Sequence, residues 1–153
     1  MNTRYYEYGR LNAKSHEFYG NSPFSFDIAL TQNEDGEGRI PSVTVEFSNI
    51  RNEKLVIESV IIKGKKVKLS NNEYLYGDMI VAGGVMITVS IKDAERMNDG
   101  HRYAFSYTDP FRYAKSLLSN LSVTVDETKN MSTKGDVVTL SLTDSNPSRA
   151  ADI

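Results

Sequence analysis

The sequence contains no cysteine and no tryptophan among its 153 residues. Without cysteine there is no disulfide, no thiolate nucleophile and no cysteine-based metal site, although this absence alone does not identify a cellular compartment. No stretch approaches the ~18 apolar residues of a membrane-spanning helix, and the N-terminal residues lack the apolar core of a signal peptide. These absences exclude a helical membrane span within these residues.

The charge balance is nearly neutral, with a net charge of −2 and an isoelectric point near 5.7. Nucleic-acid-binding domains usually have a basic patch and a high isoelectric point, so we expect no nucleic-acid partner. Hydrophobic residues make up 39% of the chain and charged residues 25%, which is typical of a folded domain large enough to bury a core.

Motifs that carry chemistry are nearly absent. His16 and His101 are the only histidines, and their spacing matches no metal-binding or catalytic pattern. There is neither a phosphate-binding loop nor a nucleophile elbow, and the acidic stretch 33–37 lacks the spacing of a calcium loop. The sequence therefore predicts no catalytic, cofactor-binding or metal-ligating residue, no cofactor and no enzymatic activity for this chain.

Most of the chain alternates between apolar and polar residues, the pattern of half-buried strands. We expect an antiparallel β-sandwich-like domain over residues 22–108, with a hairpin turning on Gly83 and Gly84. The strand predictions are 24–30, 43–47, 55–62, 67–69, 85–91 and 103–107.

The C-terminal part has a different sequence pattern, in which a helix is followed by strands. Asp109-Pro110 is a helix start signal, and the spacing predicts a helix ending near Asn120, followed by strands at 121–125 and 138–142. We therefore expect a small α/β unit at 109–153, so the fold class is α+β, mainly β.

The N-terminal residues 1–21 are predicted to be strands that join this C-terminal unit, although the order Tyr5-Tyr6-Glu7-Tyr8 also tolerates a helix. We expect these tyrosines to be loosely docked and to contribute less to the core than the strands of the sandwich.

The last residues carry the signature of a helix start. Asp144, Ser145 and Asn146 are N-cap types, Pro147 suits the first helical position, and Ala150 begins a helix-favouring stretch. Because one turn of helix is not stable alone, we expect a truncated helix and a longer parent protein.

Two side-chain groups are open to more than one interpretation. Lys63, Lys65, Lys66 and Lys68 form a basic cluster that protects a sheet edge or contacts an anionic glycan. Nine tyrosines and six phenylalanines could stack on sugars, but strand alternation assigns most of them to the core.

The segments near both ends resemble one protein family. The first comprises YY at 5–6, GRL at 9–11 and EFYGNSPF at 17–24, and the second comprises YA at 113–114, LSVTV at 121–125, VVTLSLTD at 137–144, NP at 146–147 and RAADI at 149–153. Together they resemble the periplasmic part of polysaccharide chain-length determinants, particularly those fused to or paired with a bacterial tyrosine autokinase. In that family, a strand leads into a long periplasmic helix at the second segment.

The resemblance implies a periplasmic, membrane-anchored polysaccharide co-polymerase that governs the length and export of capsular polysaccharide or exopolysaccharide. It implies self-association in a ring in the full-length protein, with a polysaccharide polymerase and an outer-membrane export channel as partners. Membrane attachment would come only from segments outside these residues. A cytoplasmic tyrosine autokinase domain would lie beyond residue 153, so no ATP site is assigned here.

Two other classes fit a β-rich chain of this composition. A free-standing carbohydrate-binding β-sandwich would present exposed aromatic side chains to a glycan. An extracellular structural or adhesin subunit would offer an unpaired sheet edge to another chain.

Overall fold

The computed structural model describes residues 3–9, 15–31, 38–50, 53–127 and 136–144. The chain divides into two compact units, residues 1–109 and residues 110–153, which are described separately below. The structure is mainly β, with antiparallel sheets and one α-helix among the described residues. The expected fold class, α+β and mainly β, is confirmed.

The first unit contains a larger sheet of seven antiparallel strands. Its order is β2 (Ser15–Phe18), β1 (Thr3–Tyr8), β10 (Arg102–Tyr107), β4 (Val43–Ile50), β5 (Lys54–Ile62) and β6 (Lys65–Val67). Strand β7 (Glu73–Leu75) pairs with the first part of the β5 edge, and β6 pairs with the last part.

The smaller sheet has three antiparallel strands in the order β3 (Phe24–Leu30), β9 (Val85–Ile91) and β8 (Met79–Ala82). Gly83 and Gly84 form the β8–β9 turn with φ angles of 51° and 82°, a conformation that L side chains rarely adopt. A Cβ on Gly83 would also lie only 2.9 Å from Cδ1 of Ile62. The hairpin predicted on these two glycines is confirmed.

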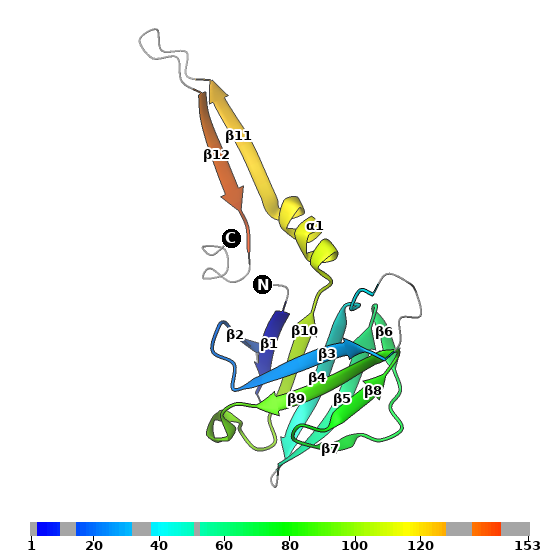
Figure 1. Cartoon of the computed structure of the whole chain (residues 1–153). Coiled ribbons are helices and arrows are strands. Elements are labelled where there is room, and N and C mark those ends of the chain that lie inside the picture. The colour runs from blue at the N-terminus through cyan, green and yellow to red at the C-terminus, as the bar shows by residue number, and fades with distance from the viewer. Residues whose placement is uncertain (1–2, 10–14, 32–37, 51–52, 128–135, 145–153) are drawn as a thin grey trace. The chain divides into compact units, whose positions relative to one another are not determined.

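The hydrophobic core lies between the two sheets, whose strands cross at a steep angle (Figure 1). Alternate residues of each strand point inward because successive side chains of a strand lie on opposite faces. The largest fully buried side chains are Tyr103, Phe24, Phe47, Phe105, Leu55, Ile80, Ile87, Val43, Val45, Val60, Val85 and Val89.

The expected placement of residues 1–21 in the C-terminal unit is wrong for the part that the structure describes. Strand β1 pairs with β10 along its whole length, and β2 pairs with β1. The Tyr5 ring contacts Phe24 edge-to-face, with centroids 5.3 Å apart, and also contacts Phe26 at 5.6 Å. Tyrosine can pack its ring while its hydroxyl stays near water, so a tyrosine-rich strand closes this core.

The second unit consists of α1 (Pro110–Asn120), β11 (Leu121–Glu127) and β12 (Asp136–Leu142), with β11 and β12 paired as an antiparallel hairpin. The predicted helix and both predicted strands are confirmed. The helix start expected near Pro147 lies outside the described residues. Within the described ranges, no helix has both the length and the apolar character that a membrane span requires.

Candidate functional site

In the first unit, three polar side chains contact the carboxylate of Glu7. Strand pairing places Glu7 on β1 opposite Tyr103 on β10, and the loop that precedes β10 supplies Asn98 and His101. Glu7 Oε1 accepts hydrogen bonds from Asn98 Nδ2 at 2.9 Å and Tyr103 Oη at 3.1 Å, and it lies 2.9 Å from His101 Nδ1. Tyr103 Oη in turn accepts a hydrogen bond from the Asn98 backbone N–H at 2.7 Å.

These contacts set the ionisation of the Glu7 carboxyl and the Tyr103 hydroxyl. Burial by itself raises the pKa of Glu7, but the hydrogen bonds from Asn98, His101 and Tyr103 outweigh it and hold the pKa of Glu7 below its ordinary value. Burial, reinforced by the charge of Glu7, raises the pKa of Tyr103 to about 12. At neutral pH Glu7 is therefore an ionised acceptor and Tyr103 a neutral donor.

The Glu7 cluster has a structural role in the fold. Tyr103 is fully buried, and its hydrogen bond to Glu7 ties β10 and the loop before it to β1. His16 lies opposite Glu7 in the β1–β2 register, and His101 contacts the Glu7 carboxylate. Even so, no group of three or more potential metal-ligating side chains occurs within the described part of the chain.

We predict that Glu7→Gln makes the protein less stable at pH 7 and less sensitive to acid. The carboxylate has a lower pKa in the folded than in the unfolded chain, so its stabilisation is present above the unfolded pKa of about 4.3 and is lost as pH falls below it. Replacing a charged acceptor by a neutral one should cost about 1–2 kcal/mol at pH 7. Thermal unfolding from pH 7 to pH 3 measures both effects. Glu95→Gln, at an exposed position, is the control; equal pH slopes in both variants would contradict the prediction.

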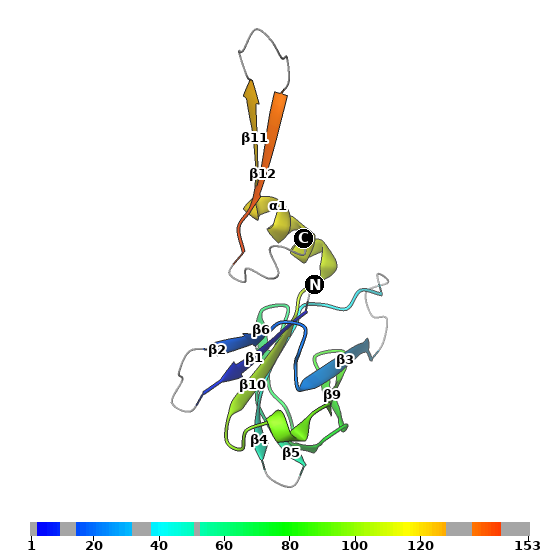
Figure 2. The same ribbon diagram turned by 90° about the vertical axis from the view of Figure 1, so that its left-hand side faces the viewer.

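The outer face of the larger sheet, which we define by Tyr6, Tyr8, Arg102, Glu46 and Ser59, is turned away from the smaller sheet. Figure 2 shows the smaller sheet on only one side of the larger one. Strand pairing places the outward side chains in rows: Tyr6, Ala104, Glu46 and Ser59 form one row, and Tyr8, Arg102 and Ser48 the next. These side chains are half-buried, except that of Ala104, which is 1% exposed.

Two outward tyrosines lie together at the β1 end of this outer face. The rings of Tyr6 and Tyr8 are inclined by 30° with centroids 6.5 Å apart, and the Arg102 guanidinium lies 5.6 Å from the centroid of Tyr8. Burial raises the pKa of Tyr8, as does the charge of Glu46, while Arg102 acts in the opposite direction. The Tyr8 hydroxyl is therefore protonated at neutral pH.

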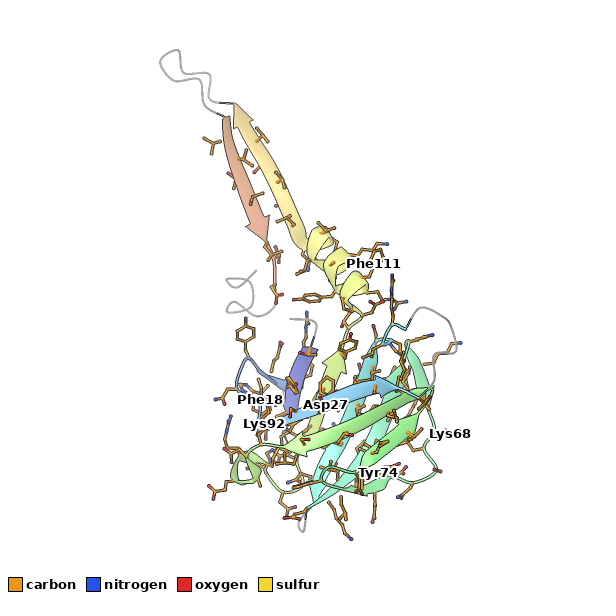
Figure 3. The ribbon with its side chains drawn as sticks, viewed as in Figure 1. Phe18, Asp27, Lys68, Tyr74, Lys92 and Phe111 are labelled. Atoms are coloured by element: carbon orange, nitrogen blue, oxygen red, sulfur yellow. The ribbon has the colours of Figure 1, made fainter. Side chains whose placement is uncertain are left out.

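A cavity of about 240 Å³ lies at the β5 edge of the same sheet. The cavity lies beside the middle of β5, between the part that pairs with β6 and the part that pairs with β7. Its walls include Lys66, Lys68, Glu58 and Asn72. A β-bulge beside Phe47 means that no residue of β4 is paired with Glu58 in the strand register. The Glu58 carboxylate nevertheless accepts a 2.7 Å hydrogen bond from the Ser48 hydroxyl. Figure 3 shows Lys68 at the margin of this unit.

The lysine cluster noted in the sequence is thus split by the structure. Lys66 and Lys68 line the cavity, whereas Lys63 lies in the β5–β6 turn with a φ of 52°. Neither the Glu7 cluster nor the paired outward tyrosines nor the bulge was predicted from the sequence. For the tyrosines alone the sequence held a signal: Tyr6 and Tyr8 are two residues apart on one strand, and such residues share a face.

Among the described residues of the second unit, one face of the β11–β12 hairpin is apolar and largely exposed. We call this the hairpin face, and its cross-strand pairs are Leu121 with Leu142, Val123 with Leu140, and Val125 with Val138. Val123 is 56% exposed and Leu140 67% exposed. The opposite face includes the pairs Ser122 with Ser141 and Thr124 with Thr139. Helix α1 likewise exposes Phe111, which is 71% accessible (Figure 3).

No protein-family model matches the chain, and comparison with curated proteins found no match either.

Proposed function

We propose that the chain is a non-catalytic periplasmic part of a membrane-anchored polysaccharide co-polymerase, which controls the chain length and export of capsular polysaccharide or exopolysaccharide. Support comes from the two sequence segments that resemble this family, the second of which includes residues 121–125 of β11 and 137–142 of β12. The apolar, largely exposed hairpin face is the observation that carries the proposal: it supplies a surface for assembly rather than for chemistry.

The occupant that we assign to the hairpin face is a second copy of the chain. An isolated two-stranded hairpin is at best marginally stable in water, so its apolar side chains need a cover. The side chains of the hairpin face carry no charge that would repel an identical face, and the same patch is present on every copy. Two identical faces in contact form a closed pair of copies, so the ring proposed for the full-length protein would join such pairs through contacts elsewhere. Tethering of many copies in one membrane raises the effective concentration at which these pairs form.

The remaining features of the proposal follow from the family resemblance. Anchoring in the inner membrane would come from other segments of the parent protein, and this part would lie in the periplasm. The expected partners are the polysaccharide polymerase and the outer-membrane export channel. Any tyrosine autokinase activity would belong to a cytoplasmic domain of the parent protein.

We predict that charge on the hairpin face changes the length of the exported polymer. The variant carries Val123→Lys with Leu140→Lys in the full-length protein, expressed in the bacterium that makes it. These residues are cross-strand partners, and two lysines would prevent an apolar contact between copies. Gel electrophoresis of the exported polysaccharide should show the broadened length distribution of a strain that lacks the protein.

The matched control places the same charges on the opposite face, as Thr124→Lys with Thr139→Lys, also a directly opposed pair. This control should keep the native length distribution at equal protein abundance. A native distribution in the apolar-face variant, or the same change in both variants, would refute the role of the hairpin face.

The carbohydrate-binding class is favoured by one observation, the outward pair Tyr6 and Tyr8. A free-standing binding module would bind glycan through these tyrosines. In that case, changes to the hairpin face would leave the length of the exported polymer unchanged. The electrophoresis experiment therefore also separates these two functions.

A further inference from the structure

The outer face of the larger sheet combines the two kinds of group that proteins use to hold sugars. Flat aromatic rings pack against the apolar C–H faces of pyranose rings, and nearby charged or amide groups accept and donate hydrogen bonds to the hydroxyls. Tyr6 and Tyr8 supply the rings at one end of this face. Glu46 and Ser59 continue the Tyr6 row toward the cavity at the β5 edge.

The spacing of these groups suits an extended ligand. Three interstrand steps separate β1 from β5, and each step is about 4.8 Å, so Tyr6 and Ser59 lie about 14 Å apart. Between Tyr6 and Glu46 the row contains Ala104, which is 1% exposed because neighbouring side chains cover it, so a ligand would lie on those neighbours. A chain laid along this row would cross the strands and reach the cavity at its far end.

The cavity adds polar groups to the end of the row. The walls of this cavity of about 240 Å³ carry the ammonium groups of Lys66 and Lys68, the amide of Asn72 and the carboxylate of Glu58. The β-bulge at Glu58 is a local feature that re-aims one side chain, and bulges of this kind are frequent at binding sites. Mixed polar and apolar walls match a sugar, which has hydroxyls at its rim and C–H groups on its faces.

We infer that the outer face of the larger sheet binds a chain of pyranose sugars, with Tyr6 and Tyr8 stacking on the rings and the Lys66–Lys68 cavity receiving the end of the chain. The inferred site depends on the proposed function only for the choice of polymer, which is the one whose length the protein controls. Its residues lie in the first unit and share none with the hairpin face.

The test is binding of oligosaccharides released by mild acid from the exopolysaccharide of the bacterium that makes this protein. Backbone amide shifts of the ¹⁵N-labelled chain should change at β1, β10 and β4 and beside the cavity, and titration of these shifts gives the affinity. Tyr8→Ala should weaken binding about tenfold, because loss of a stacked aromatic ring typically has an effect of this size. Tyr8→Phe keeps the ring and should change the affinity by less than about threefold.

Two further variants keep the result interpretable. Phe111→Ala removes a more exposed aromatic ring from the second unit, and it should leave the affinity unchanged. Glu46→Gln keeps the side-chain volume in the middle of the Tyr6 row and should weaken binding even if Tyr8→Ala proves unstable. Absence of shifts on the outer face, or equal affinity of the wild type, Tyr8→Ala and Glu46→Gln, would overturn the inference. Because these are binding measurements, they can fail while the polymer-length result stands, and the reverse is equally possible.

Discussion

Val89→Asp should abolish cooperative folding of the first unit at 25 °C. Val89 lies in the middle of β9, is 1% exposed and faces the core between the two sheets. A carboxylate at this position must either remain charged away from water or take up a proton, and both alternatives are strongly unfavourable without a partner. We expect a loss of more than about 4 kcal/mol, a large part of the total stability of an ordinary domain.

Val81→Asp is the matched control, because Val81 belongs to the neighbouring strand β8 of the same sheet but is 59% exposed. The same substitution there should cost less than about 1 kcal/mol, which covers the lower strand propensity of aspartate. Far-ultraviolet circular dichroism and urea unfolding of both variants measure the difference. Similar losses at the two positions would show that β9 does not face the core as described.

The strands of the sandwich could be predicted because their signal is local. Residues 24–30 and 85–91 alternate in the sequence, and alternation becomes burial as soon as one face of a strand is covered. The Gly83-Gly84 turn is equally local, since two adjacent residues with positive φ define the hairpin. Helix α1 followed from the Asp109-Pro110 signal at its start.

The placement of the N-terminal strands could not be predicted, because strand pairing is not local. Thr3 pairs with Tyr107 and Tyr8 with Arg102, across about a hundred residues of chain. Tyrosine suits a core, an edge or a binding face, so residues 3–8 do not identify their partner strand. The Glu7 cluster was missed for the same reason, since Asn98, His101 and Tyr103 reach Glu7 only after β1 has paired with β10.

The hairpin face shows a different limit of sequence reasoning. Leucine and valine alternate with serine and threonine in β11 and β12, as they do in core strands, and both strands were predicted correctly. In the structure, however, Val123, Val125 and Leu140 are more than half exposed. Alternation identifies an apolar face but not what covers it, so an assembly surface and a core strand have the same pattern.

Tyr5→Ala should lower the free energy of unfolding of the first unit by about 2–4 kcal/mol, although the sequence suggested a loosely docked terminus. Truncation of a buried aromatic side chain typically costs about 3–5 kcal/mol, and Tyr5 is half-buried between Phe24 and Phe26. Tyr6→Ala, one residue away on the outer face of the same strand, should cost less than about 1.5 kcal/mol, because Tyr6 does not reach the core. Urea unfolding of both variants tests this order. Equal losses would mean that β1 is not seated with Tyr5 inward, and the assignment of Tyr6 and Tyr8 to a sugar-binding face would then lose its structural basis.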